Sequence, residues 1–339
     1  MSKGGRDIHT GNTTRRIFTG ALVAATVAGS VIAQNRTFSF AYDQPPTTAY
    51  GIAANIFDAK LKELSGGKMS INQFPSAQLG QESVMLQKMR SGDIDFVITS
   101  TANASTIAPQ AGVFSLHFIF RDQNHLAKSL ADPGVAAAFR DMVKESVTGA
   151  RTLGLLTMGL RKMYSKKEVT SVADLKGQKV RVQATKTEDT HFPAYGAQIV
   201  HMPFGDVYTS LQTGVVNMAE NGVNVYLANK HYEVAPVLSL TEYEANNNCM
   251  WVSEKTWNSL SPEQQRWVQA AAEEVTKKEP TMAVQLEKDS VEKLKKLGVK
   301  VIENVDKSGF MKAAFPIQDQ LASRAGTARG EDFETCARD

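Results

Sequence analysis

Cysteine is scarce in this chain, because Cys249 and Cys336 are the only two among 339 residues. Two cysteines far apart in the sequence provide no disulfide framework; they could pair in an oxidising compartment, but we expect two free or buried thiols. The sequence also lacks a G-x-S-x-G elbow, a zinc-spaced histidine pair and a P-loop, and its six histidines are scattered. These absences argue against an enzyme, a metal site and a bound cofactor.

Net charge and long apolar runs are also lacking once the N-terminus is set aside. Of the 38 basic and 35 acidic residues, four basic residues and one acidic residue lie within residues 1–33, so the rest of the chain is formally neutral. A protein that binds nucleic acid needs a net basic face, and we therefore expect no such partner. No segment after residue 33 is long and apolar enough to span a bilayer.

The N-terminus has the pattern of an export signal. Arg15 and Arg16 precede an uncharged run over residues 17–33, which ends in small residues at Ala33. We expect cleavage near Ala33 and a periplasmic mature protein. The paired arginines resemble a twin-arginine signal, and a general secretory leader is the alternative. A membrane anchor is disfavoured because the run is short and rich in Ala, Gly, Ser and Thr.

Strand-like and helix-like segments alternate in the first part of the remaining chain. Alternating polar and apolar positions predict strands, and apolar residues three and four apart predict helices. The predicted elements are a strand at 37–42, a helix at 49–64, a strand at 69–74, a helix at 82–90 and a strand at 94–98. This order is typical of a parallel sheet covered by helices.

A second α/β pattern follows a predicted connecting helix. That helix spans 133–147, and the later strands are predicted at 152–158, 162–165, 179–183, 199–202, 215–219 and 299–302, with helices at 187–195 and 207–213. Residues 261–297 are predicted to be mostly helical, with a split or kink at Pro280.

Two α/β units with long connectors predict two lobes around a cleft. We assign residues 34–150 mainly to lobe 1, 151–250 mainly to lobe 2, 251–326 to C-terminal helices that pack across both lobes, and 327–339 to a polar tail. Ligands of open α/β sheets bind beyond the C-terminal ends of the strands, so we expect a binding site where the lobes face each other.

One arginine has the setting of an anion anchor. Lys176 and Gly177 form a turn after Asp174, and the following alternation predicts a strand in which Arg181 lies between two valines. An arginine in a strand is fixed in direction and partly desolvated, and its planar guanidinium can grip a carboxylate through two parallel hydrogen bonds. We predict that the protein is a receptor for a small organic acid, with Arg181 as its anchor.

Five blocks of the sequence, in order, resemble those of DctP-type substrate-binding proteins of tripartite ATP-independent periplasmic (TRAP) transporters. The blocks are 74–80 (F-P-x-x-Q-L-G), 82–95, 118–125 (F-I-F-R-D with a following histidine), 174–182 (D-L-K-G-x-K-x-R) and 203–221. The resemblance covers roughly residues 38–320. It implies a periplasmic-binding-protein-like fold of two α/β lobes, joined by crossing strands and a long C-terminal helix.

The resemblance also implies a function and a set of partners. Members of this family capture a substrate, usually a carboxylate, by closing their lobes, and deliver it to an integral membrane permease. Uptake is driven by an ion gradient and not by ATP, and the binding protein does no chemistry. We expect the protein to be a monomer that binds a small organic acid, with a hydroxy acid or a sugar acid as the favoured class.

Three candidate site residues match the family's binding positions. Arg181 matches the carboxylate-binding arginine, and the alternative is a sheet-edge arginine in a salt bridge. Arg161 falls where a second arginine is frequent, although a solvated surface arginine is the alternative. Asn221 matches the asparagine after the last signature strand, where its amide could bind a carboxylate or hydroxyl or simply form a turn.

The remaining candidates follow from position alone. Glu82 could favour the start of a helix or recognise a hydroxyl, Glu220 could orient an arginine, and Phe204 could pack on the ligand or on the core. Asn248 belongs to a run of three asparagines that a solvent loop would explain, although amides also suit a polyhydroxy acid. Four polar residues at the expected cleft complete the set, and they are Tyr42, Gln44, Ser100 and Asn103.

The chain departs from the family pattern around the expected cleft. Tyrosines stand at Tyr42 and Tyr243, where histidines are common, Gly222 stands where proline is usual, and His117 replaces the proline of the third block. The identity of the acid therefore cannot be transferred from a relative. Rival interpretations are a binding protein of an ATP-driven importer, a ligand presenter for a sensor kinase and, less favoured, a periplasmic enzyme.

Overall fold

Two mixed β-sheets form the framework of the protein. The computed structural model describes residues 35–144 and 146–324, all of them within one unit. The first sheet has the strand order β2-β1-β3-β10-β4. Its strands are β1 (Arg36–Ala41), β2 (Met69–Phe74), β3 (Phe96–Ser100), β4 (Ala150–Leu160) and β10 (Ala245–Ser253). Strand β1 is parallel to β2 and β3, whereas β10 is antiparallel to β3 and β4.

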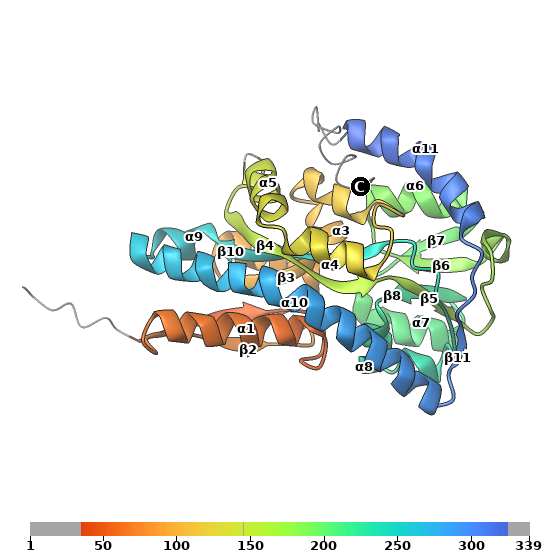
Figure 1. Ribbon diagram of the computed structural model, residues 1–339, viewed down its shortest axis with the longest axis horizontal. Helices are drawn as coiled ribbons and strands as arrows, with labels where there is room; N and C mark the ends of the chain where they lie inside the picture. The colour runs from red at the N-terminus through yellow and green to blue at the C-terminus, as the bar shows by residue number, and fades with distance from the viewer. Residues whose placement is uncertain (1–34, 145, 325–339) are drawn as a thin grey trace, which may run out of the picture. The chain divides into compact units, whose positions relative to one another are not determined.

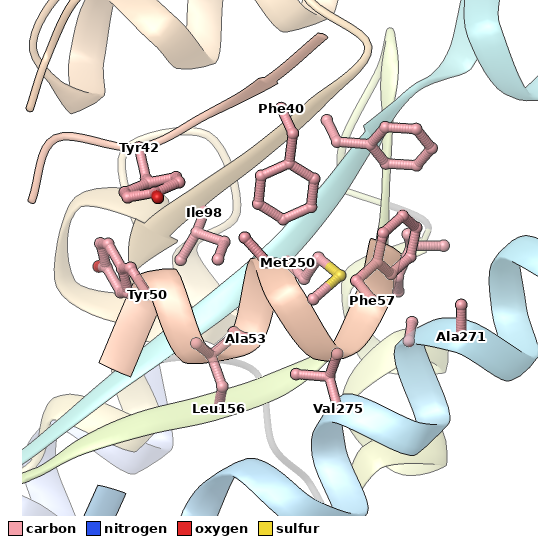
Figure 2. Close-up of a cluster of buried hydrophobic side chains, with 14 of the residues drawn as sticks. Phe40, Tyr42, Tyr50, Ala53, Phe57, Ile98, Leu156, Met250, Ala271 and Val275 are labelled. Atoms are coloured by element: carbon pink, nitrogen blue, oxygen red, sulfur yellow. The ribbon is translucent and has the colours of Figure 1, made fainter. Parts of the chain in front are cut away.

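Alternation along these strands builds a hydrophobic layer on each face of the first sheet. Phe40 and Ile98 point to one face, where they pack against α1 (Ala49–Leu64) and α10 (Pro262–Lys296); Figure 2 shows them with Phe57 of α1 and Val275 of α10. Val97, one position from Ile98, points to the other face. That face is covered by α2 (Glu82–Ser91), α4 (Gln123–Ala131) and α5 (Pro133–Lys144).

The second sheet has the strand order β11-β9-β5-β8-β6-β7. Its strands are β5 (Lys162–Ser165), β6 (Lys179–Val182), β7 (Gln198–His201), β8 (Met218–Asn221), β9 (Val237–Ser239) and β11 (Lys300–Ile302). Helices α6 (Lys186–Ala194) and α11 (Ser308–Arg324) pack on one face, and α7 (Val207–Thr213) and α8 (Val223–Ala228) pack on the other. Each sheet with its helices is one lobe.

The lobes are joined by two strand crossings and by one long helix. Arg161 is the single residue between β4 of the first sheet and β5 of the second, and Glu244 immediately precedes β10. The two crossings are hydrogen-bonded to each other, because Arg161 N donates to Glu244 O at 2.7 Å. Helix α10 contacts α1 and β4 in the first lobe and α8 and β11 in the second (Figure 1).

Short elements complete the described part of the chain. The α-helices are α3 (Thr101–Ala104) and α9 (Glu254–Asn258), and the 3₁₀ helices are η1 (Pro109–Ser115), η2 (Val172–Leu175), η3 (Phe204–Asp206) and η4 (His231–Glu233). The predicted strands and helices of both lobes are present, and four of them have the predicted bounds: α1, β2, β5 and α7. The two-lobed α/β prediction is therefore confirmed.

Several details differ from the predictions. The run of three asparagines lies in β10, a buried strand, and not in a solvent loop. Helix α10 continues through Pro280 without a split. Strands β4 and β10 pair in the first sheet, although both lie within or overlap residues 151–250, which we assigned mainly to lobe 2. Helices α4 and α8 (Val223–Ala228) and strands β9 and β10 were not predicted as elements, and α11 falls within the predicted C-terminal helical region 251–326.

Some predictions concern residues that the structure does not describe. The export signal at 1–33 and the polar tail at 327–339 lie outside the described residues, as does Cys336. Cys249 is a free, buried cysteine in β10. Among the described helices, each is either too short or too polar to cross a membrane.

Candidate ligand-binding site

A cavity of about 290 Å³ lies between the two lobes. Its wall is formed where β1, β3, β6 and β8 end, which is the expected position for a ligand of α/β sheets. A cavity of this size is at the small end of the range for ligand sites. Eight of the eleven predicted residues line it: Gln44, Glu82, Ser100, Asn103, Arg161, Arg181, Phe204 and Asn221.

Strand β6 presents Arg181 to the cavity. Its neighbours Val180 and Val182 are buried in the hydrophobic core of the second lobe, so the residue between them points to the opposite side of the strand. The Nε and Nη2 atoms of Arg181 donate to Met202 O at 3.2 and 3.0 Å. Nη1 has only a long contact of 3.7 Å with Glu220 Oε1 among the described residues. Arg181 therefore keeps donor capacity for an anion.

Arg161 is buried at the crossing of the strands and is largely occupied by the protein. Its Nη1 lies 2.5 Å from Glu220 Oε2 and its Nε lies 3.2 Å from Glu244 Oε2. Burial alone would lower the pKa of Arg161, but these two carboxylates reverse the effect and hold the pKa well above its usual value. Nη2 donates to Gln183 Oε1 at 3.0 Å and Asn246 Oδ1 at 3.2 Å. Arg161 thus fixes the orientation of two cavity amides.

The bonds from Arg161 occupy the side-chain oxygens of Gln183 and Asn246. The amide nitrogens of these two residues donate to other acceptors, Ser100 Oγ and Asn221 Oδ1. The Oδ1 atom of Asn221 accepts from Gly222 N at 2.9 Å and from Asn246 Nδ2 at 2.7 Å. Its Nδ2 is therefore free to donate to a ligand oxygen. Asn221 is the last residue of β8, and like Arg181 it places its polar group at the cavity wall.

Glu82 organises the first-lobe wall of the cavity. It accepts hydrogen bonds from Ser100 N at 3.0 Å, Ser100 Oγ at 2.8 Å and Asn103 Nδ2 at 2.6 Å. Both oxygens are engaged, so the carboxylate fixes the junction between β3 and α3 in addition to beginning α2. The sequence offered two roles for Glu82, which are to favour the start of a helix and to recognise a hydroxyl. The structure adds a third role, because Glu82 also holds neighbouring segments of the first lobe in place.

The loop after β1 adds a second carboxyl group to the first-lobe wall. Asp43 accepts from Gln44 Nε2 at 3.1 Å. Burial, and next the charge of Glu82, raise the pKa of Asp43 well above its usual value. A carboxyl group of this kind can donate as well as accept a hydrogen bond, which suits a hydroxyl partner.

Phe204 supplies an apolar surface next to the anchor. The Arg181 guanidinium lies 5.9 Å from the centroid of the Phe204 ring, and the centroid of the His231 ring lies 5.4 Å from that of Phe204. The aromatic face therefore borders the position where an anion would meet Arg181.

Three predicted residues do not line the cavity. Tyr42 is completely buried in the core of the first lobe, where its hydroxyl donates to Gln73 Oε1 at 2.7 Å. Glu220 lies behind the two arginines and accepts from Tyr243 OH at 3.0 Å. Asn248 is enclosed in β10 and accepts from Tyr50 OH at 2.6 Å. The asparagine of this run that lines the cavity is Asn246.

Three hydrogen bonds made by residues of the cavity wall join the lobes. Gln183 Nε2 donates to Ser100 Oγ at 2.8 Å, Asn229 Nδ2 donates to Gln44 Oε1 at 3.1 Å, and Gly205 N donates to Gln81 Oε1 at 3.4 Å. In each pair one residue comes from each lobe. Side chains of the wall therefore also serve as contacts that hold the lobes together.

Sequence reasoning missed several wall residues, and for some of them a signal was present. Gln183 lies two positions after Arg181, and the period of two in a strand directs both side chains to one side. Asp43 is adjacent to Gln44 in the same loop. Met158 and Tyr50 carried no such signal, because only the packing of β4 and α1 brings them to the cavity.

The arrangement is suited to recognise one anionic group and several hydroxyls. One guanidinium with unused donors faces the cavity from the second lobe. Amides surround it, and carboxyl groups come from the first lobe. Charge-assisted and amide hydrogen bonds of this kind fix both the position and the orientation of a polar solute.

Comparison with known proteins identifies relatives of this chain. The family model DctP, described as bacterial extracellular solute-binding protein, family 7, matches residues 40–325. The 2,3-diketo-L-gulonate-binding periplasmic protein YiaO of Escherichia coli is 30% identical over 294 residues, which cover 86% of this chain and 88% of the relative.

Solved structures show the same fold. A TRAP periplasmic solute-binding protein of Xanthobacter autotrophicus with bound β-D-galacturonate has a TM-score of 0.80 and 29% identity, and the match covers 88% of this chain and 97% of the other. A TRAP periplasmic solute-binding protein of Pseudomonas putida with bound D-glucuronate has a TM-score of 0.82 and 28% identity, over 90% of this chain and 97% of the other.

Proposed function

This chain belongs to the DctP family of bacterial extracellular solute-binding proteins, and from that premise we propose that it binds a sugar acid between its lobes and delivers it to a TRAP permease. The sugar acid is of the uronate or aldonate class, with one carboxylate and several hydroxyls. Three relatives bind sugar acids according to their names: YiaO and the proteins of the two solved structures.

The observation that carries this proposal is the state of Arg181. It lines the cavity from a buried strand, yet its Nη1 has no short contact with the described residues. A buried cation with unused donors is a receptor for an anion, because burying it without a partner is costly. The ligand carboxylate binds at this guanidinium, and the Nδ2 of Asn221 donates to the same group or to the adjacent hydroxyl.

The carboxyl groups of the first lobe favour a sugar acid over a dicarboxylate. Asp43 and Glu82 line the cavity from the lobe opposite to that of Arg181. A second ligand carboxylate directed to that lobe would meet the like charge of Glu82, whereas a hydroxyl group could donate to or accept from the Asp43 carboxyl group. The amides of Gln44 and Gln183 also suit hydroxyls. This arrangement therefore selects a monocarboxylate that carries a polyol.

The remaining steps of the proposal draw on the N-terminal sequence pattern and on the family. The leader is removed near Ala33, the mature monomer captures its ligand by closing the lobes, and membrane permease subunits import the ligand with an ion gradient. The protein binds without chemical change of the ligand. Membership in the DctP family decides against a binding protein of an ATP-driven importer, which was the main rival.

A ligand screen followed by calorimetry tests the proposal. The protein without its leader is screened by thermal shift against uronates, aldonates, C4-dicarboxylates and amino acids, because a ligand well above its Kd raises the melting temperature. We expect uronates or aldonates to give the largest shifts, a stoichiometric heat, and unchanged ligand on recovery. A response to dicarboxylates alone would contradict the substrate class, and a converted ligand would contradict the receptor function.

A further inference from the structure

A group of three potential metal ligands lies behind Arg161, outside the cavity wall. His117 follows η1, Glu188 lies in the first turn of α6, and Glu244 immediately precedes β10. Their side chains are 0%, 1% and 2% exposed. One ligand atom from each residue lies within 4.8 Å of the ligand atoms of the other two. Three segments far apart in the sequence therefore direct their polar groups to one buried point.

The atoms of this group that could bind a metal lack hydrogen-bond partners. His117 Nε2, both carboxylate oxygens of Glu188 and Glu244 Oε2 have no hydrogen-bond partner among the described residues. His117 Nε2 is 3.7 Å from Glu188 Oε2. Unpaired buried polar groups are costly and rare in native proteins. A cation placed between these residues would give each of them a partner.

The imidazole of His117 is oriented as a metal ligand would be. Its Nδ1 is 2.8 Å from the hydroxyl of Tyr195, and its ring is stacked on that of His191 with centroids 3.9 Å apart. A histidine that ligates through one nitrogen is usually held by a hydrogen bond at the other, which fixes the ring and the tautomer. Nε2 is therefore directed toward the two carboxylates by its own contacts.

The local charge also favours a cation. Arg161 and Arg181 bring two positive charges, whereas Glu188, Glu220 and Glu244 bring three negative charges when ionised. Arg161 already pairs closely with Glu220 at 2.5 Å, and its 3.2 Å approach to Glu244 Oε2 lacks hydrogen-bond alignment. The bound carboxylate of a ligand would add one more negative charge nearby. Glu188 thus has no arginine or lysine within ion-pair distance among the described residues, and Glu244 shares Arg161 with Glu220.

We propose that His117, Glu188 and Glu244 form a buried site for a divalent transition-metal cation of the Zn²⁺ type. One imidazole with two carboxylates is a ligand set that suits Zn²⁺ and its neighbours better than Mg²⁺ or Ca²⁺, which prefer oxygen alone. The ion links α6, β10 and the segment after η1 beside the strand crossing. The site does not depend on the identity of the organic ligand. It was not expected from the sequence, because its histidine stands where the resembled family has proline.

Metal retention by the folded protein tests this site. The protein without its leader is treated with a chelator and incubated overnight with Zn²⁺, Mg²⁺ or Ca²⁺, because exchange into a buried site needs local opening. After gel filtration, elemental analysis should find one Zn²⁺ per chain and no retained Mg²⁺ or Ca²⁺. X-ray absorption should show N and O ligands at about 2.0–2.2 Å, one of them an imidazole. Wild-type protein that retains no Zn²⁺ would overturn the proposal.

Substitutions of two of these residues test whether the ion binds at this site. His117→Asn keeps a polar group near Tyr195 but removes Nε2, and Glu244→Gln removes a charged ligand; each should weaken Zn²⁺ binding more than about 10-fold. His125→Asn, at a histidine in the turn that begins α4, is the matched control and should bind as the wild type does. Zn²⁺ binding unchanged in a folded His117→Asn or Glu244→Gln protein would refute the assignment. If His117→Asn does not fold, Glu244→Gln and the imidazole signal of the wild type decide.

Discussion

At the scale of single residues, the two arginines of the cavity have different tasks. Both were predicted as ligand-binding residues, and both line the cavity. The guanidinium of Arg161 bonds to Glu220, Gln183 and Asn246. The Nη1 of Arg181 has no such short contact among the described residues, so it can donate to a ligand. Strand alternation was enough to predict the direction of Arg181. The pairing of Arg161 with carboxylates from distant parts of the sequence could not be read from its neighbours.

Replacement of the anchor should weaken binding without unfolding the protein. Arg181→Ala removes the charge-assisted bonds to the ligand carboxylate, which corresponds to about 2–4 kcal/mol, or roughly 30-fold to 1000-fold in Kd. Calorimetry with the best sugar acid measures the change. Arg151→Ala is the control, because this arginine pairs with Glu254 at the surface, where both side chains are 41% exposed. Equal affinity of Arg181→Ala and wild type would exclude the anchor role.

A buried histidine beside the cavity should make stability depend on pH. Burial, and then the charge of Arg181, lower the pKa of His231 to about 4. Between the unfolded pKa near 6.5 and the folded value, only the unfolded chain binds the proton, so the free energy of unfolding falls as pH decreases in this window. Above pH 6.5 this residue has no such effect.

His231→Asn should reduce that pH dependence. Asparagine can keep a partner for Tyr164 OH, which is 2.8 Å from His231 Nδ1, but it does not titrate. Between pH 7 and 4.5 the variant should lose roughly 2–3 kcal/mol less unfolding free energy than the wild type. Urea unfolding at both pH values measures the loss. Parallel pH profiles of the two proteins would show that His231 is not responsible.

At the scale of elements, hydrophobic periodicity predicted most of the long helices and most strands, but it failed for β10. The segment Asn246–Asn248 has low strand propensity, which favoured a loop. In the structure these amides are buried and bonded to Tyr50, Arg161 and Phe114 O, all of them distant in sequence. Tertiary hydrogen bonds therefore override local propensity. Hydrogen-bond partners that are distant in sequence cannot be identified from one sequence before the fold is known.

The long helix α10 is attached to the second lobe by one buried carboxylate. Glu287 accepts from Lys162 Nζ at 2.8 Å, from Val223 N at 3.0 Å and from Asn224 N at 2.8 Å. A side chain on Gly159, which precedes the crossing into β5, would meet Glu287 Cγ at 2.6 Å. Glycine at this position, with φ +85°, therefore permits the close contact.

Removal of this carboxylate should destabilise the protein. Glu287→Ala leaves the buried Lys162 charge without its partner and exposes two backbone donors at the start of α8, so we expect a loss of about 3–5 kcal/mol in unfolding free energy. Chemical denaturation measures it. Glu292→Ala, on the same helix but 64% exposed, should change stability by less than about 0.5 kcal/mol. Similar effects of the two substitutions would contradict the anchoring role of Glu287.

At the scale of the whole described molecule, the lobes meet through the residues that line the cavity. Gln183 bonds to Ser100, and Asn229 bonds to Gln44, across the lobe boundary. A ligand that contacts both lobes would add bonds of the same kind and favour the closed arrangement. The two-lobed class followed from the order of elements, but the membership of β4 and β10 in the first sheet depended on long-range pairing.

Ligand binding should make the protein more compact. Small-angle scattering of the leader-free protein should give a smaller radius of gyration with saturating sugar acid than without it. Gln183→Ala removes one bond between the lobes and should require more ligand for the same compaction. Identical scattering curves for ligand-free and saturated wild-type protein would contradict lobe closure.

A crystal structure with D-glucuronate or D-galacturonate, whichever binds more tightly, tests the central claim most directly. The account predicts that the ligand lies between the lobes, with its carboxylate within hydrogen-bond distance of the Arg181 guanidinium and its hydroxyls toward Asp43, Gln44 and Glu82. A carboxylate bound away from Arg181, or a ligand outside the interlobe cavity, would contradict it.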